Sequence, residues 1–417
     1  MDQIFFHIDV NSAFLSWSAK QALENGCSVD YRTIPSIIGG DIEKRHGVVL
    51  AKSIPAKKYK ITTGEPIVNA LRKCPNLTIL SPDHELYHTQ SRKLMTYLSD
   101  ICPDIEQVSI DECYMNYTPI ATRFSSPETG ASFIKDGVRD TFGFTVNIGI
   151  SDRKILAKMA SDFEKPDKIH TLFHTQIKQK MWSLPVSELF MCGKSSVETL
   201  HKLGILTIGE LAQADPDILS AHLKSHGITL WEYANGIDDS TIVTQAAEAK
   251  GIGNSTTLSQ DVTTREAACQ VLLGLADSVS SRLRASRQLA GMVSTEIKYH
   301  TFQSVSHQSI LSSPAASTQA IYHLACTLFD ECWDGTPIRL LGIRTSKLVD
   351  ENEPIQMSLF DLNTDVPGSK DTTVSENGAA RPSDAKLLQL EHTIDSIRHR
   401  YGEQSVIRGS FLKKPSS

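Results

Sequence analysis

The sequence lacks the cysteine patterns that mark a disulfide framework or a zinc site. It has eight cysteines, but no C-x-x-C pair and no zinc-like spacing to histidine. Scattered thiols of this kind indicate reduced packing residues, so we expect a cytoplasmic location. There is also no recognisable signal peptide and no apolar run long enough to cross a bilayer, so we expect no membrane partner.

Positive charge is not in excess either. The 417 residues carry a formal net charge of −6, which gives no indication of a nucleic-acid partner. Residues 350–384 contribute −6 and residues 385–417 contribute +3, so the remainder is near −3. A nearly neutral protein of this kind binds DNA only where its positive charge is concentrated on one face. The length allows several domains, each with its own core.

Three carboxylates lie at the ends of strand-like segments. Asp9 ends the first apolar run, and Asp111 and Glu112 lie at the joint of a predicted hairpin. An acidic pair alone is most often a solvated turn, as we expect for Asp238-Asp239. A charge at the end of a buried strand changes this interpretation, because an interior cannot hold it unpaired. The set predicts a site for two divalent cations and phosphoryl transfer with a nucleotide.

Three ordered motifs resemble a known family. They are His7-Ile-Asp-Val-Asn-Ser-Ala-Phe14, Ser109-Ile-Asp-Glu-Cys-Tyr114 and the segment from Asn147 to Lys165-Pro166. Together they resemble the Y-family DNA polymerases, the enzymes of translesion synthesis, over roughly residues 1–350. The resemblance implies template-directed addition of deoxynucleotides to a primer, low fidelity without proofreading, and a role in DNA damage tolerance and repair. The partners would be primed DNA and deoxynucleoside triphosphates, and we expect a monomer.

The fold class that the resemblance implies is a multidomain α+β protein with a right-hand polymerase architecture. The palm would be an antiparallel sheet with helices on one face, the thumb a helical domain with a helix–hairpin–helix, and the little finger an α/β domain. The expected bounds are 1–11 and 82–171 for the palm, 12–81 for the fingers, 172–241 for the thumb, 242–250 for a linker, 251–349 for the little finger, 350–384 for a flexible tail and 385–417 for a C-terminal helix and tail. Whether that helix docks on the core or on a partner stays open.

The resemblance assigns catalysis to Asp9, Asp111 and Glu112. With the backbone carbonyl of Val10, these residues would hold two Mg²⁺ ions. Phe14 would be a steric gate, an aromatic ring that excludes the ribose 2′-hydroxyl. Plain core packing is the alternative for this phenylalanine.

The triphosphate would be bound by backbone and side-chain donors. The amides of Ala13 and Phe14, at a helix N-terminus, suit phosphate, as do Ser53, Lys57 and Lys165. Lysines around position 57 are equally consistent with a solvated helix face. Similar polymerases carry Tyr and Arg where this chain has Ile54 and Lys57. How tightly this chain binds the triphosphate therefore stays an open question. Lys158 receives no assignment.

Two segments are candidates for contacts with DNA. Gly193 and Lys194 belong to the predicted hairpin, although Met191 replaces its first glycine, and a simple helical turn is the alternative. In the predicted little finger, helices over 265–287 and 316–332 alternate with three strand-like runs. Four basic residues there are candidates for phosphate contacts, or else solubilising charges: Arg282, Arg284, Arg287 and Lys298.

A short peptide in the predicted tail resembles the motif that docks on the bacterial sliding clamp. Its elements are Gln356, Leu359 and Phe360. Two large apolar residues would fill a pocket while the glutamine makes polar contacts. The alternative is a chance Leu-Phe pair in a linker.

Two other functions are consistent with parts of the pattern. One is a DNA-binding accessory protein with a decayed polymerase fold, and the intact carboxylates argue against it. The other is a palm enzyme such as a nucleotide cyclase, which also uses paired carboxylates and two metals. The predicted hairpin, little finger and sliding-clamp peptide argue against the cyclase.

Overall fold

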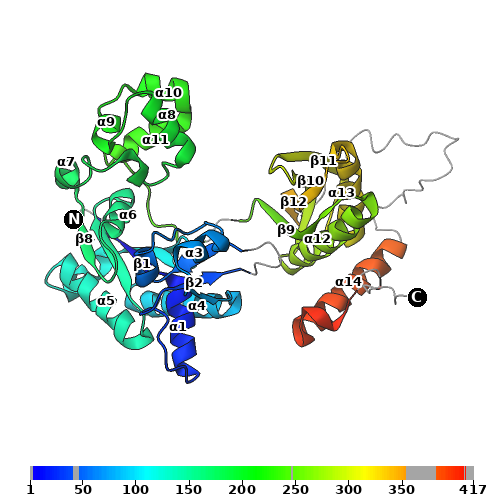
Figure 1. Ribbon diagram of the computed structural model, residues 1–417, viewed down its shortest axis with the longest axis horizontal. Coiled ribbons are helices and arrows are strands. Elements are labelled where there is room, and N and C mark those ends of the chain that lie inside the picture. The colour runs from blue at the N-terminus through cyan, green and yellow to red at the C-terminus, as the bar shows by residue number, and fades with distance from the viewer. Residues whose placement is uncertain (1–2, 41–46, 246–247, 354–381, 408, 410–417) are drawn as a thin grey trace. The chain divides into compact units, whose positions relative to one another are not determined.

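The computed structural model describes residues 3–40, 47–245, 248–353, 382–407 and 409 (Figure 1). They form two compact units, which are taken separately below: the described residues of 3–40 and 47–245, and those from 248 onward. The expected sliding-clamp peptide at 356–360 lies outside the described residues.

A five-stranded sheet organises the first unit. Its strand order is β5-β6-β1-β7-β8, with all pairs antiparallel except β7–β8. The central position of β1 makes every one of its residues buried, which explains its nearly continuous apolar sequence. The bounds are β1 (Phe5–Val10), β5 (Ile105–Gln107), β6 (Glu112–Asn116), β7 (Val146–Ser151) and β8 (Ile169–Thr171).

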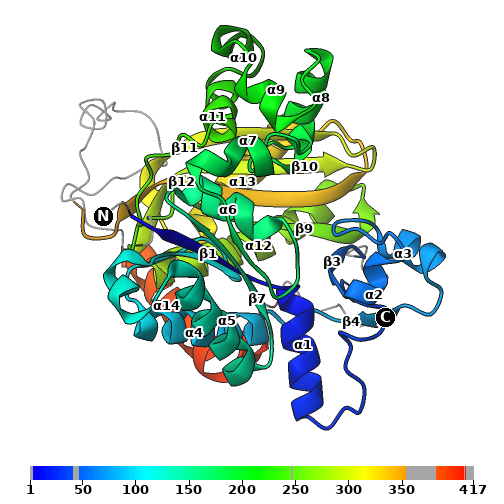
Figure 2. The same ribbon diagram turned by 90° about the vertical axis from the view of Figure 1, so that its left-hand side faces the viewer.

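Helices cover both faces of this sheet, whereas the sequence suggested helices on one face. Phe6, Ile8 and Val10 pack in one core with α4 (His84–Ile101) and α5 (Pro127–Phe142). Successive side chains of a strand alternate between faces, so His7 and Asp9 point the other way, toward α6 (Lys154–Asp162). Figure 2 shows α6 on the opposite side of β1 from α4 and α5.

The helix α6 lies unusually close to the sheet. A Cβ atom at Gly149 of β7 would lie 1.9 Å from the Ala157 carbonyl oxygen and 2.5 Å from the Ser161 amide nitrogen. Only glycine therefore permits this approach. The close contact brings side chains of α6 down to the level of His7 and Asp9.

A small three-stranded layer follows β1 and α1 along the chain. It consists of β2 (Ser36–Gly39), β3 (Val49–Lys52) and β4 (Thr78–Leu80), with α2 (Ile54–Lys57) and α3 (Ile67–Lys73). This layer has its own apolar core. Helix α1 (Ala13–Glu24) differs, because its Ala13 and Trp17 pack in the core of the five-stranded sheet.

A helical region completes the first unit. Its core is shared with Ile155, Leu156 and Met159 of α6, so it is built directly onto that helix. The 3₁₀ segment η1 (Thr118–Arg123) belongs to the sheet region. The helical region contains η2 (His174–Gln176), α7 (Ile177–Lys180), η3 (Val186–Glu188), α8 (Lys194–Lys202), α9 (Ile208–Ala212), α10 (Pro216–Leu223) and α11 (Ser225–Ala234).

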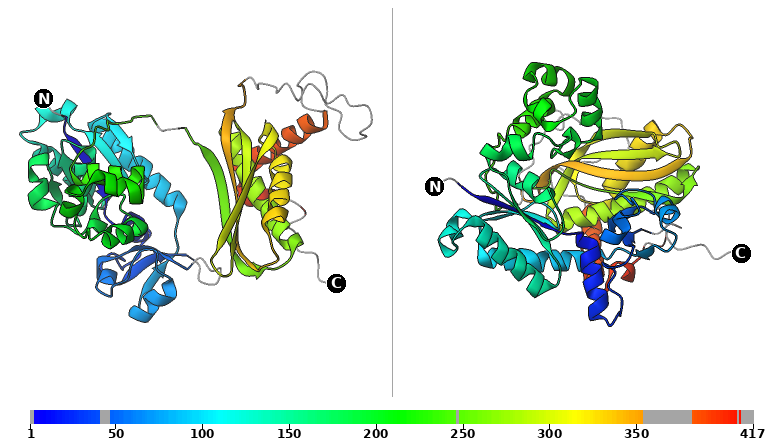
Figure 3. Two further views of the ribbon diagram at one scale, coloured as in Figure 1. Left: turned by 90° about the horizontal axis from the view of Figure 1, so that it is seen from above. Right: turned by 60° about the vertical axis from the view of Figure 1, so that its left-hand side comes forward.

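The second unit is a four-stranded antiparallel sheet in the order β11-β10-β12-β9. Both predicted helices are present, and they cover one face of the sheet (Figure 3). Strand β11 was not predicted, because its first part is rich in serine and exposed. The bounds are β9 (Gly251–Val262), α12 (Arg265–Ala285), β10 (Gln288–Tyr299), β11 (Ser304–Ala315), α13 (Thr318–Cys332) and β12 (Ile338–Asp350).

The C-terminal helix α14 (Pro382–Tyr401) docks on α12, followed by η4 (Glu403–Ser405). Its docking is polar. Arg284 of α12 contacts Glu391 at 2.9 Å and Asp395 at 2.7 Å, and its side chain is only 4% exposed. Arg398 of α14 in turn lies 2.7 Å from Asp277 of α12. The question that the sequence left open is thus answered for this helix: it docks within its own chain.

Candidate active site

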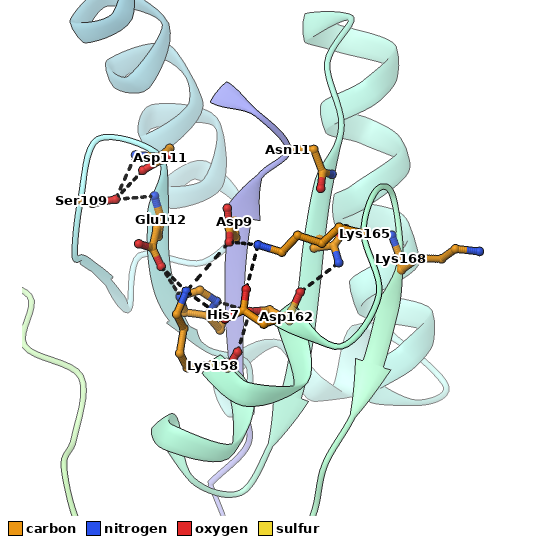
Figure 4. A network of polar contacts seen from close by, with 12 residues as sticks. His7, Asp9, Asn11, Ser109, Asp111, Glu112, Lys158, Asp162, Lys165 and Lys168 are labelled. Carbon is orange, nitrogen blue, oxygen red and sulfur yellow. Dashed lines mark hydrogen bonds and ion pairs between the residues drawn. The ribbon is translucent and has the colours of Figure 1, made fainter. Parts of the chain in front are cut away.

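Strand pairing brings two of the predicted carboxylates together. Asp9 on β1 is directly opposite Glu112 on β6, and the Val10 amide donates a 3.0 Å hydrogen bond to the Asp111 carbonyl oxygen. The three residues therefore lie at one end of the central strand pair. Figure 4 shows their side chains around the end of β1.

Ser109 holds the turn that carries Asp111. Its hydroxyl lies 2.6 Å from Asp111 Oδ1 and accepts hydrogen bonds from the amides of Asp111 and Glu112 at 3.2 and 3.1 Å. Burial raises the pKa of Asp111, and the negative charges of Asp9 and Glu112 raise it further. A carboxylate with this environment is stabilised by any cation that joins the cluster.

Glu112 is held by basic groups on the α6 side of the sheet. Its Oε2 lies 2.7 Å from Lys158 Nζ and 3.0 Å from His7 Nε2. These two contacts outweigh partial burial and lower the pKa of Glu112 to about 2. Glu112 is therefore ionised at neutral pH.

Lys165 lies over Asp9. Its ammonium forms a short contact with Asp9 Oδ2 and a 2.8 Å contact with Asp162 Oδ1. Burial opposes the charged form, but the charges of Asp9 and Asp162 outweigh it and raise the pKa of Lys165. Asn147 fixes the loop that carries Lys165, because its amide donates to the carbonyl oxygens of Ser161 and Glu164.

The site opens into a cleft of about 380 Å³ between the sheet and the three-stranded layer. Burial, and then the charge of Lys57, lower the pKa of Lys52 on one wall. Most of the predicted catalytic, metal and nucleotide residues are brought together here. The lining includes Asp9, Val10, Ala13, Phe14, Lys57, Asp111 and Lys165.

Phe14 forms part of the floor of this cleft. Its ring stacks on Tyr87 with centroids 4.3 Å apart and an interplanar angle of 5°. It also meets His84 edge to face at 6.4 Å. The ring is thus both packed against the core and present at the cleft, so the two interpretations of this residue are compatible.

Ser53 has a structural role that the sequence did not indicate. Its hydroxyl accepts hydrogen bonds from the Ala56 and Ser36 amides, each at 3.1 Å, and donates to the Ile34 carbonyl oxygen at 2.8 Å. The residue is 2% exposed. It caps α2 and so positions Lys57, while a direct contact of Ser53 with phosphate stays a prediction.

The carboxylate oxygens of Asp9, Asp111 and Glu112 are of the ligand type that Mg²⁺ binds. Carboxylate oxygens are its preferred ligands, and the ammonium groups of Lys158 and Lys165 already occupy cation positions against Glu112 and Asp9. With the side chains in these positions, no three His, Cys, Asp or Glu residues within the described ranges are grouped closely enough to hold a metal ion.

The predicted hairpin is shorter than a helix–hairpin–helix would be. The element directly before it is the 3₁₀ segment η3, and Gly193 caps α8. Met191 has a φ of 66°, the left-handed conformation that glycine adopts without strain. The backbone at Met191 therefore adopts a conformation typical of glycine, although the residue is a methionine. The Lys194 side chain is 93% exposed.

The prediction for Arg284 was wrong. Its guanidinium is buried against Glu391 and Asp395, so it fastens α14 and is not available to DNA. Arg282 differs, since it donates to the Gly253 carbonyl oxygen at 2.8 Å at the edge of the sheet. Arg287 is exposed at the end of α12. Lys298 alternates with the buried Ile297 and so lies on the open face of the sheet.

That open face contains a hollow of about 940 Å³, which the sequence did not indicate. Its lining is small and polar, and Arg344 supplies a positive charge. Small residues alternating with buried apolar ones in β10 and β12 are the signal that could have identified it. The lining includes Gly253, Ser255, Ser294, Glu296, Ser306, Gln308, Gly342, Arg344 and Ser346.

The described residues contain no helix that is long and apolar enough to span a membrane. The two units and the acidic strand ends together define a right-hand polymerase of mixed α+β structure. A solved structure of a Y-family DNA polymerase chimera, Dbh-Dpo4(243-245)-Dbh, matches with a TM-score of 0.73 at 19% identity, over 83% of this chain and 99% of that one.

Sequence comparisons place the chain within this class. Residues 8–162 match the model of the impB/mucB/samB family, and residues 249–359 match the model of its C-terminal domain. The chain is 45% identical to DNA polymerase IV of Clostridium acetobutylicum over 99% of each chain. It is 33% identical to DNA polymerase IV 1 of Bacillus subtilis over 100% of this chain and 94% of that one. The chain belongs to the impB/mucB/samB family, the Y-family DNA polymerases, as the motifs predicted.

Proposed function

We propose that the chain adds deoxynucleotides to a primer 3′-end on a DNA template by two-metal phosphoryl transfer. One observation carries this proposal. Asp9 and Asp111 line the same cleft as Lys57 and Lys165. A cleft with carboxylates on one side and lysines on the other suits a triphosphate together with its metal ions.

The acidic side would bind the metals. Asp9, Asp111 and Glu112, with the Val10 carbonyl oxygen, would hold two Mg²⁺ ions. When bound, these ions lower the pKa of the primer 3′-hydroxyl and neutralise the triphosphate and the departing pyrophosphate. The raised pKa of Asp111 supports this assignment, because its cause includes like charges that a cation would compensate.

The basic side would bind and orient the triphosphate. Lys165 would exchange its contact with Asp9 for a phosphate, and Lys57 would approach from α2, which Ser53 caps. The amides of Ala13 and Phe14 at the start of α1 are further donors. The Phe14 ring, fixed by its stacking on Tyr87, would exclude a ribose 2′-hydroxyl.

Primed DNA would be held by surfaces that do not read sequence. We propose that the five-stranded sheet serves as palm, the three-stranded layer as fingers, the helical region as thumb and the four-stranded sheet as little finger. The polar hollow on the open sheet face, with Arg344 in its lining, suits a phosphate backbone, and Lys298 lies on the same face of the sheet. Gly193 and Lys194 at the start of α8, and the exposed Arg287, are further candidates.

The remaining proposals rest on the family and on the tail sequence. We propose a cytoplasmic, monomeric enzyme of low fidelity without proofreading, acting in DNA damage tolerance. Gln356, Leu359 and Phe360, outside the described residues, would bind the sliding clamp. Such a tether raises the local concentration of the enzyme at primer ends.

The test is single-nucleotide incorporation on a primed template with Mg²⁺, comparing the wild-type chain with Asp111→Ala. We expect templated incorporation by the wild type alone. Equal activity in both would contradict the assignment of the carboxylates. Activity in neither, also with sliding clamp added, would contradict the polymerase itself and favour an accessory role in DNA binding.

A further inference from the structure

Two lysines contact the catalytic carboxylates, and their environments differ. Lys165 has a 29% exposed side chain and lines the cleft. Lys158 has a 12% exposed side chain, is absent from the lining of the cleft, and approaches Glu112 from α6 (Figure 4). Lys165 can thus leave for a phosphate, whereas Lys158 stays behind the carboxylates.

The contacts of Lys158 favour its charged form. Burial opposes the charge, but the hydrogen bond to Glu112 and the negative charges of Asp162 and Asp9 outweigh it, so the pKa of Lys158 is raised. Its Nζ lies 2.7 Å from Glu112 Oε2, 3.5 Å from Asp162 Oδ2 and 3.9 Å from Asp9 Oδ2. Glu112 is by far its nearest partner.

His7 contacts the same oxygen of Glu112, Oε2. Its Nε2 lies 3.0 Å from Glu112 Oε2, but the contact is bent, since Nε2 makes no hydrogen bond of ordinary angle. The other ring nitrogen, Nδ1, lies 2.8 Å from the Ser161 hydroxyl.

The two groups meet at one oxygen of Glu112. Among the described residues, none donates a hydrogen bond or forms an ion pair to the other oxygen, Oε1. A carboxylate fixed through Oε2 offers Oε1 in a defined direction. Because the His7 contact is bent, the hydrogen bond from Lys158 is the only well-directed one to Glu112 Oε2 within the described part of the chain.

We propose that Lys158 is a positioning residue, which orients Glu112 as a metal ligand with His7 as its support. This inference rests on the proposed two-metal function. Groups that orient a metal ligand typically contribute tenfold to hundredfold in affinity or activity. The competing explanation is that Lys158 only stabilises the fold, as any buried ion pair partner would.

The chain supplies a matched control one turn earlier on the same helix. Lys154 has an 8% exposed side chain, and its Nζ lies 2.6 Å from Glu106 Oε2. Helix and partner type are therefore the same as for Lys158, and the burial of the two side chains is similar. Glu106 is not a proposed metal ligand. Lys154→Met removes an equivalent buried ion pair and leaves Glu112 in place.

The experiment compares Lys158→Met, Lys158→Arg and Lys154→Met in the full-length chain. Single-turnover incorporation is measured against nucleotide and Mg²⁺ concentration, and thermal unfolding checks the fold. For Lys158→Met we expect a rate at saturating nucleotide at least about tenfold lower, with the nucleotide dissociation constant changed less than about threefold. Lys158→Arg, which keeps the charge, should be faster than Lys158→Met. Lys154→Met should unfold as easily as Lys158→Met but keep the wild-type rate.

A second measurement separates positioning from simple charge. Mn²⁺ binding is followed by electron paramagnetic resonance in complexes with a dideoxy-terminated primer and the next nucleotide. Loss of orientation should weaken Mn²⁺ binding by Lys158→Met about tenfold, whereas loss of a repelling charge alone would strengthen it. Unchanged or stronger Mn²⁺ binding, an unchanged rate, or equal effects in Lys154→Met would overturn the proposal. Absence of incorporation by the wild type would instead contradict the proposed function.

Discussion

A buried arginine, Arg284, contributes to the docking of α14 on α12, and Glu391→Gln tests this contribution. Arg284 and Glu391 both have side chains that are 4% exposed, with 2.9 Å between Nη1 and Oε2. Glu391 also accepts a hydrogen bond from the Thr318 amide at 3.1 Å. Glutamine keeps the shape and an acceptor for Thr318, but it removes the charge that compensates Arg284.

The size of the effect follows from burial. Removing one partner of a buried ion pair costs about 3–5 kcal/mol, because the remaining charge stays desolvated. Asp395 still lies 2.7 Å from Arg284, so we expect the lower end, about 3 kcal/mol. The loss of stability cannot exceed the free energy of docking of α14, because α14 can detach and let water reach Arg284.

Hydrogen exchange of the α14 amides measures this opening directly. A loss of about 3 kcal/mol corresponds to exchange roughly a hundredfold faster in Glu391→Gln. Asp330→Asn is the control, because Asp330 pairs with Arg265 at 2.6 Å but both side chains are exposed, and it should change the exchange of α14 little. Equal and small changes in the two variants would show that α14 does not depend on the Arg284 pair.

The other predictions concern the cleft, α6 and the tail. Phe14→Ala should admit ribonucleotides, measured as the ratio of ribonucleotide to deoxynucleotide incorporation, and an unchanged ratio would remove its role as gate. Lys165→Met should raise the KM for the nucleotide about tenfold with a smaller change in kcat, because it removes a phosphate contact; an unchanged KM would refute that contact. Gly149→Ala should cost about 3 kcal/mol in denaturant unfolding, since its Cβ would lie 1.9 Å from the Ala157 carbonyl oxygen. Leu359→Ala should abolish binding to the sliding clamp in a pull-down and leave clamp-free incorporation unchanged.

The carboxylates could be found from sequence because each follows a strand-like run. Asp9 ends a run whose apolar residues have to be buried, and the pair Asp111-Glu112 lies at a hairpin joint. What the sequence could not show is the register. A shift of one residue between β1 and β6 would place Glu112 on the opposite face from Asp9.

The basic residues were predicted less well, since a sequence does not reveal which charge has a partner. Lys158 and Lys165 look alike in the chain, but α6 turns the first toward Glu112 and the loop after it places the second over the cleft. Arg282, Arg284 and Arg287 also look alike. Only the structure shows that the middle one is buried against α14.

A signal for that docking is nevertheless present in the sequence. Asp277 and Arg284 are seven residues apart on α12, and Glu391 and Arg398 are seven residues apart on α14. Residues seven apart lie on one face of a helix. Asp277 contacts Arg398, and Arg284 contacts Glu391, so the two helices pair in antiparallel order with opposite charges facing each other. Reversing either helix, or shifting it by one turn, would separate these pairs and leave buried charges uncompensated. The two ion pairs therefore specify the direction and register of α14 more strongly than its weakly amphipathic apolar residues can, which explains why apolar periodicity alone left its partner undetermined.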